Sequence, residues 1–251
     1  MVIKLKKTMI PKIIHYCWFG RGEMPDWVVQ CIASWHKYMP DWEYHLWSED
    51  NFAISFAPMY VQEAYQAKKY AFVSDYVRLW ALEQYGGLYL DTDVEVIKSF
   101  ESLMNDTAFI GLEESLALLP GTCVMACEAH CQWVNDMLAT YDGAHFLCED
   151  GTMDMTTNVQ RLGKLMVHGG LSHERKIQFL PHWGLRVYTH DYFSPITSTR
   201  VMRKSKNTYC IHRFAGTWVD GKKGGLRDWW IVREIINILA QLKRFIRHLI
   251  K

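Results

Sequence analysis

The stretch that decides the fold runs from residue 73 to residue 94 and reads Val73-Ser74-Asp75-Tyr76-Val77-Arg78-Leu79-Trp80-Ala81-Leu82-Glu83-Gln84-Tyr85-Gly86-Gly87-Leu88-Tyr89-Leu90-Asp91-Thr92-Asp93-Val94. Apolar residues recur at helical spacing up to Tyr85, and Gly86-Gly87 supplies the left-handed backbone that ends helices. The β-rich segment Leu88 to Asp91 follows directly. The sequence therefore predicts a helix, an abrupt stop and a strand with Asp91 and Asp93 at its end.

Strands and helices are predicted to alternate on both sides of this stretch. Ile13 to Phe19 indicates a buried strand, a helix is expected from Pro25-Asp26 up to Pro40, and Tyr44 to Trp47 indicates a second strand. The remaining predictions are helices over 60–68, 131–141 and 158–167 and strands over 94–97, 108–112 and 122–126. This alternation predicts an α/β layered fold whose ligands gather where strands end.

Length and charge narrow the class of protein. The 251 residues fit one domain, expected over 9–220, followed by a basic amphipathic helix over 221–251. That helix either packs on the domain or lies on an anionic membrane surface, and both interpretations stay open. The 28 basic and 27 acidic residues nearly cancel, so no nucleic-acid partner is expected. Without an apolar run of about 18 residues or a secretory signal, we expect a cytoplasmic protein, with peripheral contact at the inner face of the membrane as an option.

Seven cysteines are an odd number without disulfide-framework spacing, which favours reduced thiols. On a helix, Cys123, Cys127 and Cys131 would share a face and could offer thiolates to a soft metal. Burial as small apolar side chains is the favoured interpretation, because no C-x-x-C pair is present.

Asp91 and Asp93 are the leading candidates for chemistry. They are alternate residues, so in an extended chain both carboxylates point to one side and offer hard oxygen ligands to a divalent cation. The competing interpretation is a turn after Leu90 with solvated aspartates, and an isolated D-x-D pattern favours that turn.

Three segments change this weighting: residues 10–20 (Ile-Pro-Lys-Ile-Ile-His-Tyr-Cys-Trp-Phe-Gly), 71–79 (Ala-Phe-Val-Ser-Asp-Tyr-Val-Arg-Leu) and 85–94 (Tyr-Gly-Gly-Leu-Tyr-Leu-Asp-Thr-Asp-Val). Together they resemble the D-x-D-motif sugar transferases, which include bacterial capsular-polysaccharide transferases, fungal α-mannosyltransferases and glucosylating clostridial toxins. The resemblance runs from about Ile10 to Trp218. It implies a GT-A-type single domain, with a Rossmann-like mixed sheet flanked by helices, a Mn²⁺ or Mg²⁺ cofactor and retention of anomeric configuration.

The resemblance also implies roles for single residues. Trp18 stacks on the base of a nucleotide sugar, Tyr89 lies near this donor, and Asp75 and Arg78 hold sugar hydroxyls. Core packing is the alternative for Trp18, and a local ion pair is the alternative for Asp75 and Arg78. Asp75, Arg78, Asp91 and Asp93 form the predicted catalytic set.

The predicted metal ligands are Asp91, Asp93 and His212, with Asp91 also contacting the ribose of the donor. His212 belongs to the segment Ile211-His212-Arg213-Phe214-Ala215-Gly216-Thr217-Trp218, in which Thr217 and Trp218 are implied to reach the diphosphate. A structural role is the alternative for a single histidine of this kind.

The resulting hypothesis is a retaining hexosyltransferase that builds capsular or other surface polysaccharide. UDP-hexose is the first expectation for the donor and GDP-mannose the second, and the acceptor is a glycan or lipid-linked glycan. One alternative is a magnesium phosphatase of the haloacid-dehalogenase type, although Glu95 stands where that motif wants Thr or Val. Another is a sugar-binding module without turnover. The polar cluster Asp154, Thr156, Thr157 and Asn158 indicates either an acceptor site or a helix N-cap.

Overall fold

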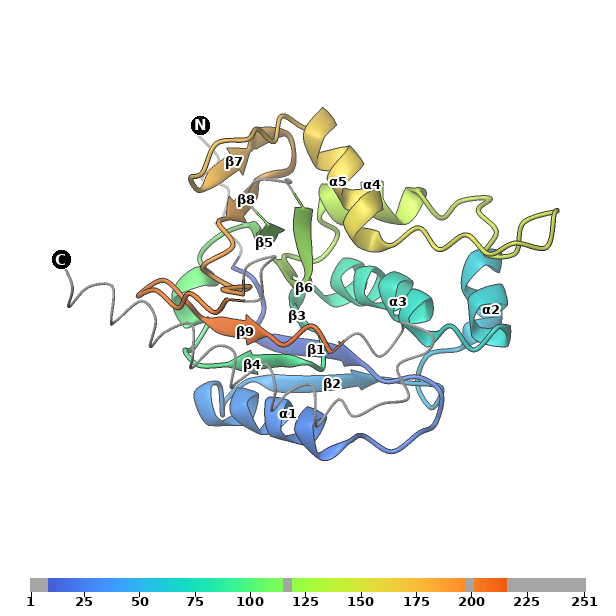
Figure 1. The fold of residues 1–251 in the computed structure, drawn as a ribbon, viewed down its shortest axis with the longest axis horizontal. Helices are drawn as coiled ribbons and strands as arrows, with labels where there is room; N and C mark the ends of the chain where they lie inside the picture. Colours follow the sequence, from blue (N-terminus) through green and yellow to red (C-terminus); the bar gives the residue numbers. More distant parts are fainter. Residues whose placement is uncertain (1–8, 115–118, 197–200, 216–251) are drawn as a thin grey trace, which may run out of the picture.

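The computed structural model describes residues 9–114, 119–196 and 201–215, and its centre is a seven-stranded sheet (Figure 1). In spatial order the strands are β2 (Glu43–Trp47), β1 (Ile13–Cys17), β3 (Gly87–Leu90), β6 (Leu119–Cys127), β5 (Ala108–Glu114), β8 (Leu185–Tyr188) and β7 (Gln178–Leu180). A separate ribbon pairs β4 (Val94–Val96) with β9 (Cys210–His212).

Strand directions make the sheet mixed. β2, β1 and β3 run parallel, β6 is antiparallel to both β3 and β5, and β8 is parallel to β5 but antiparallel to β7. The parallel part is the Rossmann-like half, since helices connect its strands. The predicted α/β architecture, a mixed sheet flanked by helices, is confirmed.

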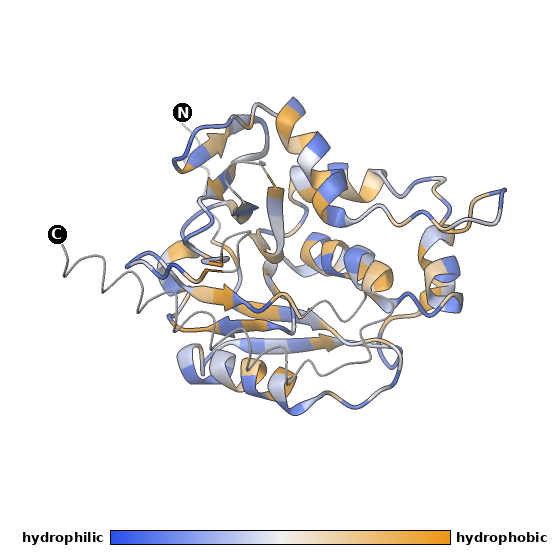
Figure 2. Cartoon of the chain, in the orientation of Figure 1, coloured by the Kyte–Doolittle hydropathy of each residue, from blue (hydrophilic) through white to orange (hydrophobic). Residues whose placement is uncertain are grey.

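Both faces of the sheet are covered. Helices α2 (Met59–Gln66), α3 (Tyr70–Tyr85), α4 (Gln132–Ala139) and α5 (Asn158–His168) bury apolar residues on one face, and α1 (Asp26–Tyr38) packs with the β4–β9 ribbon on the other. Short 3-10 helices span Ile54–Phe56, Glu101–Leu103 and Pro181–Trp183. Hydrophobic and hydrophilic residues alternate around the helices in Figure 2, as amphipathic packing requires. Strand β3 contributes side chains to the hydrophobic cores on both faces of the sheet: Leu88 and Leu90 face α1, whereas Tyr89 faces α3.

The Gly86-Gly87 pair ends α3 and starts β3, as predicted. Both residues have positive φ, 64° at Gly86 and 105° at Gly87. A Cβ on Gly87 would lie 2.7 Å from the carbonyl oxygen of Ile13 and 3.2 Å from Nε2 of His15. Glycine is therefore needed twice here, for the left-handed backbone and for the close approach of β3 to β1.

Some predictions differ from the structure. Strands β7, β8 and β9 were not predicted, because each is only three or four residues long, and β8 and β9 also pair with distant segments. The strand predicted over 122–126 is confirmed as part of β6, so the alternative in which Cys123, Cys127 and Cys131 share a helical face is wrong: the first two lie on β6, and Cys131 is the N-cap of α4. Six of the seven cysteines are buried, as expected of small apolar side chains, and Cys148 is exposed.

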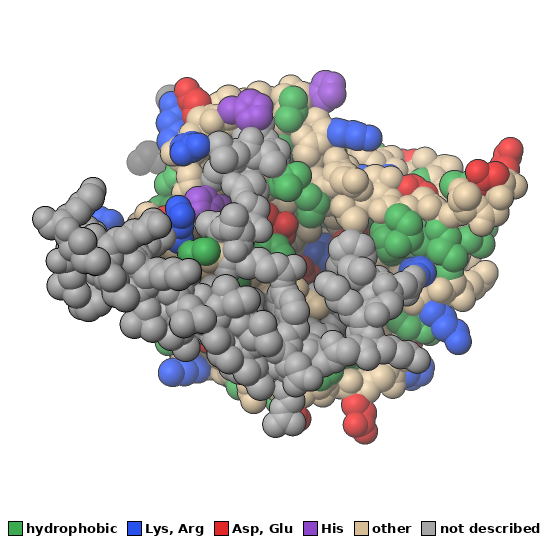
Figure 3. Space-filling view, viewed as in Figure 1, with side chains coloured by type: hydrophobic (Ala, Val, Ile, Leu, Met, Phe, Trp, Pro, Cys, Tyr) green, Lys and Arg blue, Asp and Glu red, His purple; other side chains and the backbone are tan. Residues whose placement is uncertain are grey.

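The predicted helix over 221–251 and the domain boundary at residue 220 lie outside the described residues. Within the part of the chain that is described, no helix has both the length and the apolar character needed to cross a membrane. On the face of the molecule shown in Figure 3, the visible Lys and Arg side chains of the described residues are scattered and form no continuous stripe.

Candidate active site

Asp91 follows β3 directly, at the carboxyl end of the parallel strands. Residues 91–94 form a turn rather than the extended segment expected, with the N–H of Val94 donating to the carbonyl oxygen of Asp91 at 3.0 Å. The turn nevertheless brings the acidic side chains together. One ligand atom each from Asp91, Asp93 and His212 lie within 4.8 Å of one another.

Arg78 joins the two carboxylates of the site. Its Nη2 lies 3.0 Å from Oδ1 of Asp75, and its Nη1 lies 3.0 Å from Oδ1 of Asp91, with the Arg78 side chain only 7% exposed. The i, i+3 ion pair that was the alternative interpretation of Asp75 and Arg78 is therefore present, but it is buried, and Arg78 extends it from α3 to Asp91 after β3. Because a guanidinium offers five donors in one plane, Arg78 can hold both carboxylates at once.

An irregularity in β6 completes this arrangement. The β5–β6 register shifts between Ile110 and Gly111, so residues 122–124 have no partner on β5. Two carbonyl oxygens of this segment face the site: that of Thr122 accepts from Nη1 of Arg78 at 2.9 Å, and that of Cys123 accepts from the N–H of Asp91 at 2.9 Å. In a regular ladder these carbonyl oxygens would accept from the neighbouring strand; because the pairing is interrupted here, they are available to Arg78 and Asp91.

Tyr89 contacts both Asp91 and Arg78. Its hydroxyl donates to Oδ1 of Asp91 at 2.9 Å, and the guanidinium carbon of Arg78 lies 4.6 Å from the centre of its ring. Tyr89 is only 2% exposed. The structure thus places it where it orients Asp91.

Asn158 is a contact of Asp75 that the sequence did not assign. Its backbone N–H donates to Oδ2 of Asp75 at 3.0 Å, and its Nδ2 donates to the Asp75 carbonyl oxygen at 2.6 Å. Thr157 forms a capping box with Gln160 at the start of α5. Of the two interpretations of the 154–158 cluster, the helix N-cap is confirmed.

The β4–β9 ribbon brings His212 to Asp93. Val94 pairs with His212 in its register, and Nε2 of His212 lies 3.4 Å from Oδ1 of Asp93. The other carboxylate oxygen of Asp93 accepts from the N–H of Ala215 at 2.8 Å. The predicted partnership of residues about 120 positions apart thus has a backbone cause, the pairing of two short strands.

Burial and charge set the protonation of this group. Burial raises the pKa of Asp91, although Arg78 opposes the shift. Burial acts in the same direction on Asp93, but His212 and the N–H of Ala215 outweigh it and lower the pKa of Asp93. For His212, burial opposes protonation, but Cys123 and Asp93 outweigh it and raise the pKa of the imidazole. A metal ion must therefore displace a proton from His212, because only a neutral ring nitrogen can ligate.

The remaining predicted residues are placed as follows. Trp18 follows the end of β1, half-buried, and its indole N–H donates to the carbonyl oxygen of Gly22 at 2.6 Å. Trp18 therefore stands at the same edge of the sheet as Asp91. Thr217 and Trp218 lie outside the described residues.

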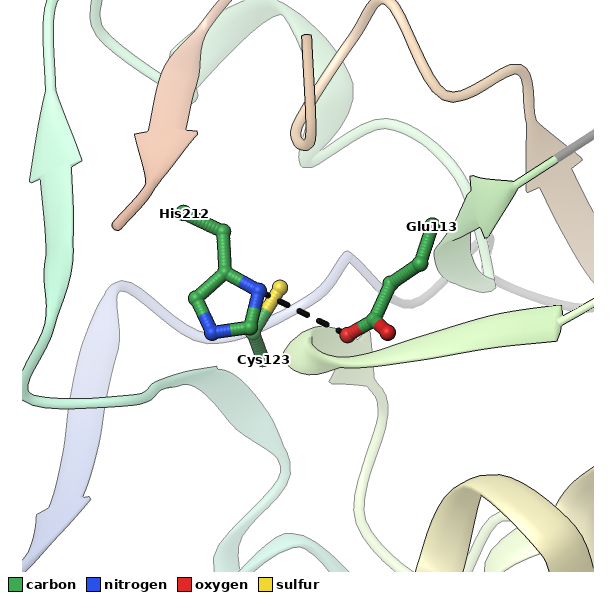
Figure 4. A group of neighbouring side chains, drawn as sticks. All are labelled: Glu113, Cys123 and His212. Carbon is green, nitrogen blue, oxygen red and sulfur yellow. Dashed lines mark ion pairs between the residues drawn. The ribbon is translucent and has the colours of Figure 1, made fainter. Parts of the chain in front are cut away.

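Glu113 is a neighbour of the site that the sequence did not predict. Its Oε1 lies 3.5 Å from Nδ1 of His212 (Figure 4), whereas Asp93 faces the other ring nitrogen, Nε2. The usable signal was a carboxylate directly after the apolar run 108–112, the same pattern that marks Asp91 after β3. The β5 end and His212 are far apart in sequence, so the pairing itself was not visible.

Fold and site together define an α/β protein with an acidic pair and a histidine at the carboxyl end of its parallel strands. Residues 25–110 match a family model described as "Glycosyltransferase sugar-binding region containing DXD motif". The matched segment contains Asp75, Arg78, Tyr89, Asp91 and Asp93. The resemblance predicted from the motifs is confirmed over this segment, which matches the description of a glycosyltransferase sugar-binding region and contains the D-x-D motif.

Relatives with known names match a similar part of the chain. Inositol phosphoceramide mannosyltransferase 3 of Schizosaccharomyces pombe is 34% identical over 108 residues, which cover 42% of this chain and 30% of that protein. Inositol phosphoceramide mannosyltransferase 1 of the same organism is 26% identical over 111 residues, covering 40% and 33%. The chain thus spans about a third of the length of these relatives. Among solved structures, the PaToxG glycosyltransferase aligns at a TM-score of 0.47 and 17% identity over 64% of this chain and 71% of that one.

Proposed function

We propose that this protein is a glycosyltransferase that moves a hexose from a nucleoside diphosphate sugar to a hydroxyl group of a glycan. The observation that carries the proposal is the convergence of Asp91, Asp93 and His212, whose ligand atoms lie within 4.8 Å of one another at the end of β3. The match of residues 25–110 to a sugar-binding region supports it.

The donor set fits Mn²⁺ or Mg²⁺. Carboxylate oxygens suit hard cations, and one imidazole nitrogen beside them is better matched to Mn²⁺. Nε2 of His212 and Oδ1 of Asp93 lie 3.4 Å apart. This distance is too long for a good hydrogen bond, but two neighbouring ligands of one cation can lie this far apart. When bound, such a cation neutralises the charge that develops on the departing diphosphate.

The protein side chains would divide the remaining work. Trp18 offers an aromatic face to the base of the donor. The donors of Arg78 are taken up largely by protein acceptors, so we propose that Arg78 holds Asp75 and Asp91 in position. The hydroxyl of Tyr89 orients Asp91 through its hydrogen bond. Asp91 then presents its other carboxylate oxygen, Oδ2, to a hydroxyl group of the donor, and Asp75, whose two oxygens each hold one protein partner, offers its remaining acceptor positions.

The finer assignments follow from the resemblance. We propose transfer with retention: the acceptor oxygen attacks the anomeric carbon from the face that the diphosphate leaves, the carbon–oxygen bond to phosphate breaks, and the acceptor proton passes to the departing phosphate oxygen. UDP-hexose remains the first candidate donor, and the mannosyltransferase names of the two relatives favour GDP-mannose as the second. A surface or capsular polysaccharide, lipid-linked or free, is the proposed acceptor. We also propose that the protein acts in the cytoplasm or at the inner face of the membrane.

The test is release of nucleoside diphosphate from UDP-hexoses and GDP-mannose by the full-length protein with Mn²⁺. We expect release with one donor, its loss on chelation, and its loss in Asp93→Ala together with metal-dependent donor binding. Full activity of Asp93→Ala would refute the proposal. Rapid phosphate release from a generic phosphate ester with Mg²⁺ would instead identify a phosphatase, and donor binding without any release would identify a binding module.

A further inference from the structure

Glu113, Cys123 and His212 form a second group of potential metal ligands beside the proposed donor site. One ligand atom from each lies within 4.8 Å of the other two, and Figure 4 shows the three side chains converging. Their elements are fixed: Glu113 lies on β5, Cys123 in the irregular part of β6, and His212 on β9. Gly121 keeps space for the carboxylate, because a Cβ there would lie 3.2 Å from Cγ of Glu113.

The imidazole nitrogen that faces this group lacks a hydrogen bond. Nδ1 of His212 is buried and has no hydrogen-bond partner among the described residues, and the residue is only 8% exposed. Its separation of 3.5 Å from Oε1 of Glu113 exceeds the range of about 2.7–3.2 Å for a hydrogen bond. It is close to the distance of about 3.4 Å between two ligands that each lie about 2.1 Å from a tetrahedral ion.

The chemistry of the three ligands differs from that of the aspartate pair. A thiolate with an imidazole and one carboxylate suits Zn²⁺ and similar thiophilic ions, whereas oxygen ligands suit Mg²⁺ and Mn²⁺. The Cys123 thiol is 1% exposed, and its polar neighbour is the Ser194 hydroxyl at 3.8 Å. Three protein ligands leave the fourth position of a tetrahedral ion for water.

We propose that Glu113, Cys123 and Nδ1 of His212 form a site for Zn²⁺ or a similar thiophilic divalent ion. Binding breaks the S–H bond of Cys123, forms a sulfur–metal bond and releases the thiol proton to water. A neutral imidazole that ligates through Nδ1 keeps its proton on Nε2, the nitrogen that faces Asp93. Zinc at this site therefore removes a ligand from the catalytic cation, a consequence that rests on the proposed function.

Co²⁺ tests the site directly, because a thiolate ligand gives cobalt a charge-transfer band in the near ultraviolet that oxygen and nitrogen ligands do not give. We expect the full-length protein to show this band, Cys123→Ser to lose it, and Cys148→Ser, altered at the exposed cysteine, to keep it. Asp93→Asn should also keep it. The absence of the band from the natural protein, or its full retention in Cys123→Ser, overturns the proposal.

A second variant guards against misfolding of the first. Glu113→Gln keeps the size of the side chain and should weaken Zn²⁺ binding more than about tenfold in competition with a chromophoric chelator, the lower end of the loss known for outer partners of metal sites. Unchanged affinity would contradict the proposal. Neither readout needs turnover, so the zinc site and the transferase activity can fail independently.

The competition between the two ions has its own measurement. Protein-bound Mn²⁺ is silent in a room-temperature spin-resonance spectrum compared with the free ion, so its displacement is visible as rising signal. We expect zinc to release Mn²⁺ from the natural protein at lower concentration than from Cys123→Ser. Equal zinc concentrations for both proteins would refute the competition.

Discussion

Nη1 of Arg78 lies 3.0 Å from Oδ1 of Asp91, and the arginine side chain is 7% exposed. This contact connects the middle of helix α3 to the residue that follows β3. Since Asp75, Thr122 and Ser74 take further donors of the same guanidinium, Arg78 acts mainly on the protein itself. Its substitution should therefore affect both the stability of the fold and the position of Asp91.

Arg78→Lys should separate charge from geometry. Lysine keeps the positive charge but lacks the planar fork, so it cannot hold Asp75, Asp91 and the Thr122 carbonyl together. We expect the free energy of unfolding to fall by about 1–3 kcal/mol, the contribution of hydrogen bonds to charged groups. Donor hydrolysis should fall by roughly tenfold or more, as when outer partners of a metal site are lost. Urea unfolding and nucleoside diphosphate release measure the two effects.

Arg186→Lys is the matched control for Arg78→Lys. Arg186 pairs with Asp106 at 2.8 Å, but its side chain is 40% exposed and lies on β8, away from the acidic pair. Because the arginine of this pair is partly open to solvent, we expect the pair to contribute about 1 kcal/mol or less. Similar losses in both variants would contradict the role given to Arg78.

Tyr89→Phe removes only the hydroxyl that donates to Asp91. A hydrogen bond to the charged form of a carboxylate stabilises that form, so its loss should raise the pKa of Asp91 further. We expect metal-dependent donor hydrolysis to weaken about tenfold, with the optimum displaced to higher pH. A pH profile of the reaction at saturating Mn²⁺ is the measurement. Tyr209→Phe, whose hydroxyl lies 2.8 Å from that of Ser102, should leave the profile in place.

His15 should give the fold a dependence on pH. Its Nε2 lies 2.8 Å from the Gly86 carbonyl oxygen, and its Nδ1 accepts from the indole N–H of Trp47 at 3.2 Å, so the neutral ring fits both contacts. Burial lowers the pKa of His15 from 6.5 to about 4. Between these values the unfolded chain binds a proton that the folded protein does not, so the free energy of unfolding falls as the pH drops from 6.5 to 4.

The size of this effect follows from the shift. At about 1.4 kcal/mol per pKa unit, His15 should contribute about 3 kcal/mol of stability above pH 6.5 that is lost near pH 4. Urea unfolding at a series of pH values measures the slope, and His15→Gln, which does not titrate, should have a shallower slope in this window. Parallel slopes for the two proteins would show that His15 is not the titrating group.

Gly87→Ala should destabilise the junction of α3 and β3. The added Cβ would meet the Ile13 carbonyl oxygen at 2.7 Å, and φ is 105°. We expect a loss of about 2–4 kcal/mol, since backbone strain and a contact that cannot relax act together. Gly143→Ala is the control, because Gly143 also has positive φ, 66°, but nothing lies within 4 Å of its Cβ. A loss at Gly143 as large as that at Gly87 would mean that φ alone is responsible.

Local sequence determined much of the fold. The helix that became α3 was predicted because its apolar residues recur at helical spacing and two glycines follow. Strand β3 was predicted because the residues that follow the two glycines are β-rich, and with it the position of Asp91 at a strand end. A turn after Leu90 was the alternative to an extended segment. Residue types alone did not distinguish the two, and the hydrogen bond from the N–H of Val94 to the Asp91 carbonyl oxygen shows that the turn forms.

Long-range pairing limited the prediction of the site. His212 was assigned from a segment resemblance, but its contact with Asp93 depends on β9, a three-residue strand with no periodicity to detect. Glu113 and Asn158 reach the site from β5 and α5, and no spacing in the sequence links them to Asp91 or Asp75. Cys123 was predicted on a strand over 122–126, which β6 confirms, but nothing in the sequence linked it to His212 or Glu113.

The irregular part of β6 holds Arg78 and Asp91 through main-chain oxygens only. The side chains of Thr122 and Cys123 take no part in these two contacts, although both are buried. A substitution of similar size at position 123 should therefore leave the acidic pair in place. With the proposed zinc site, one codon at this position would decide whether the protein responds to a heavy metal.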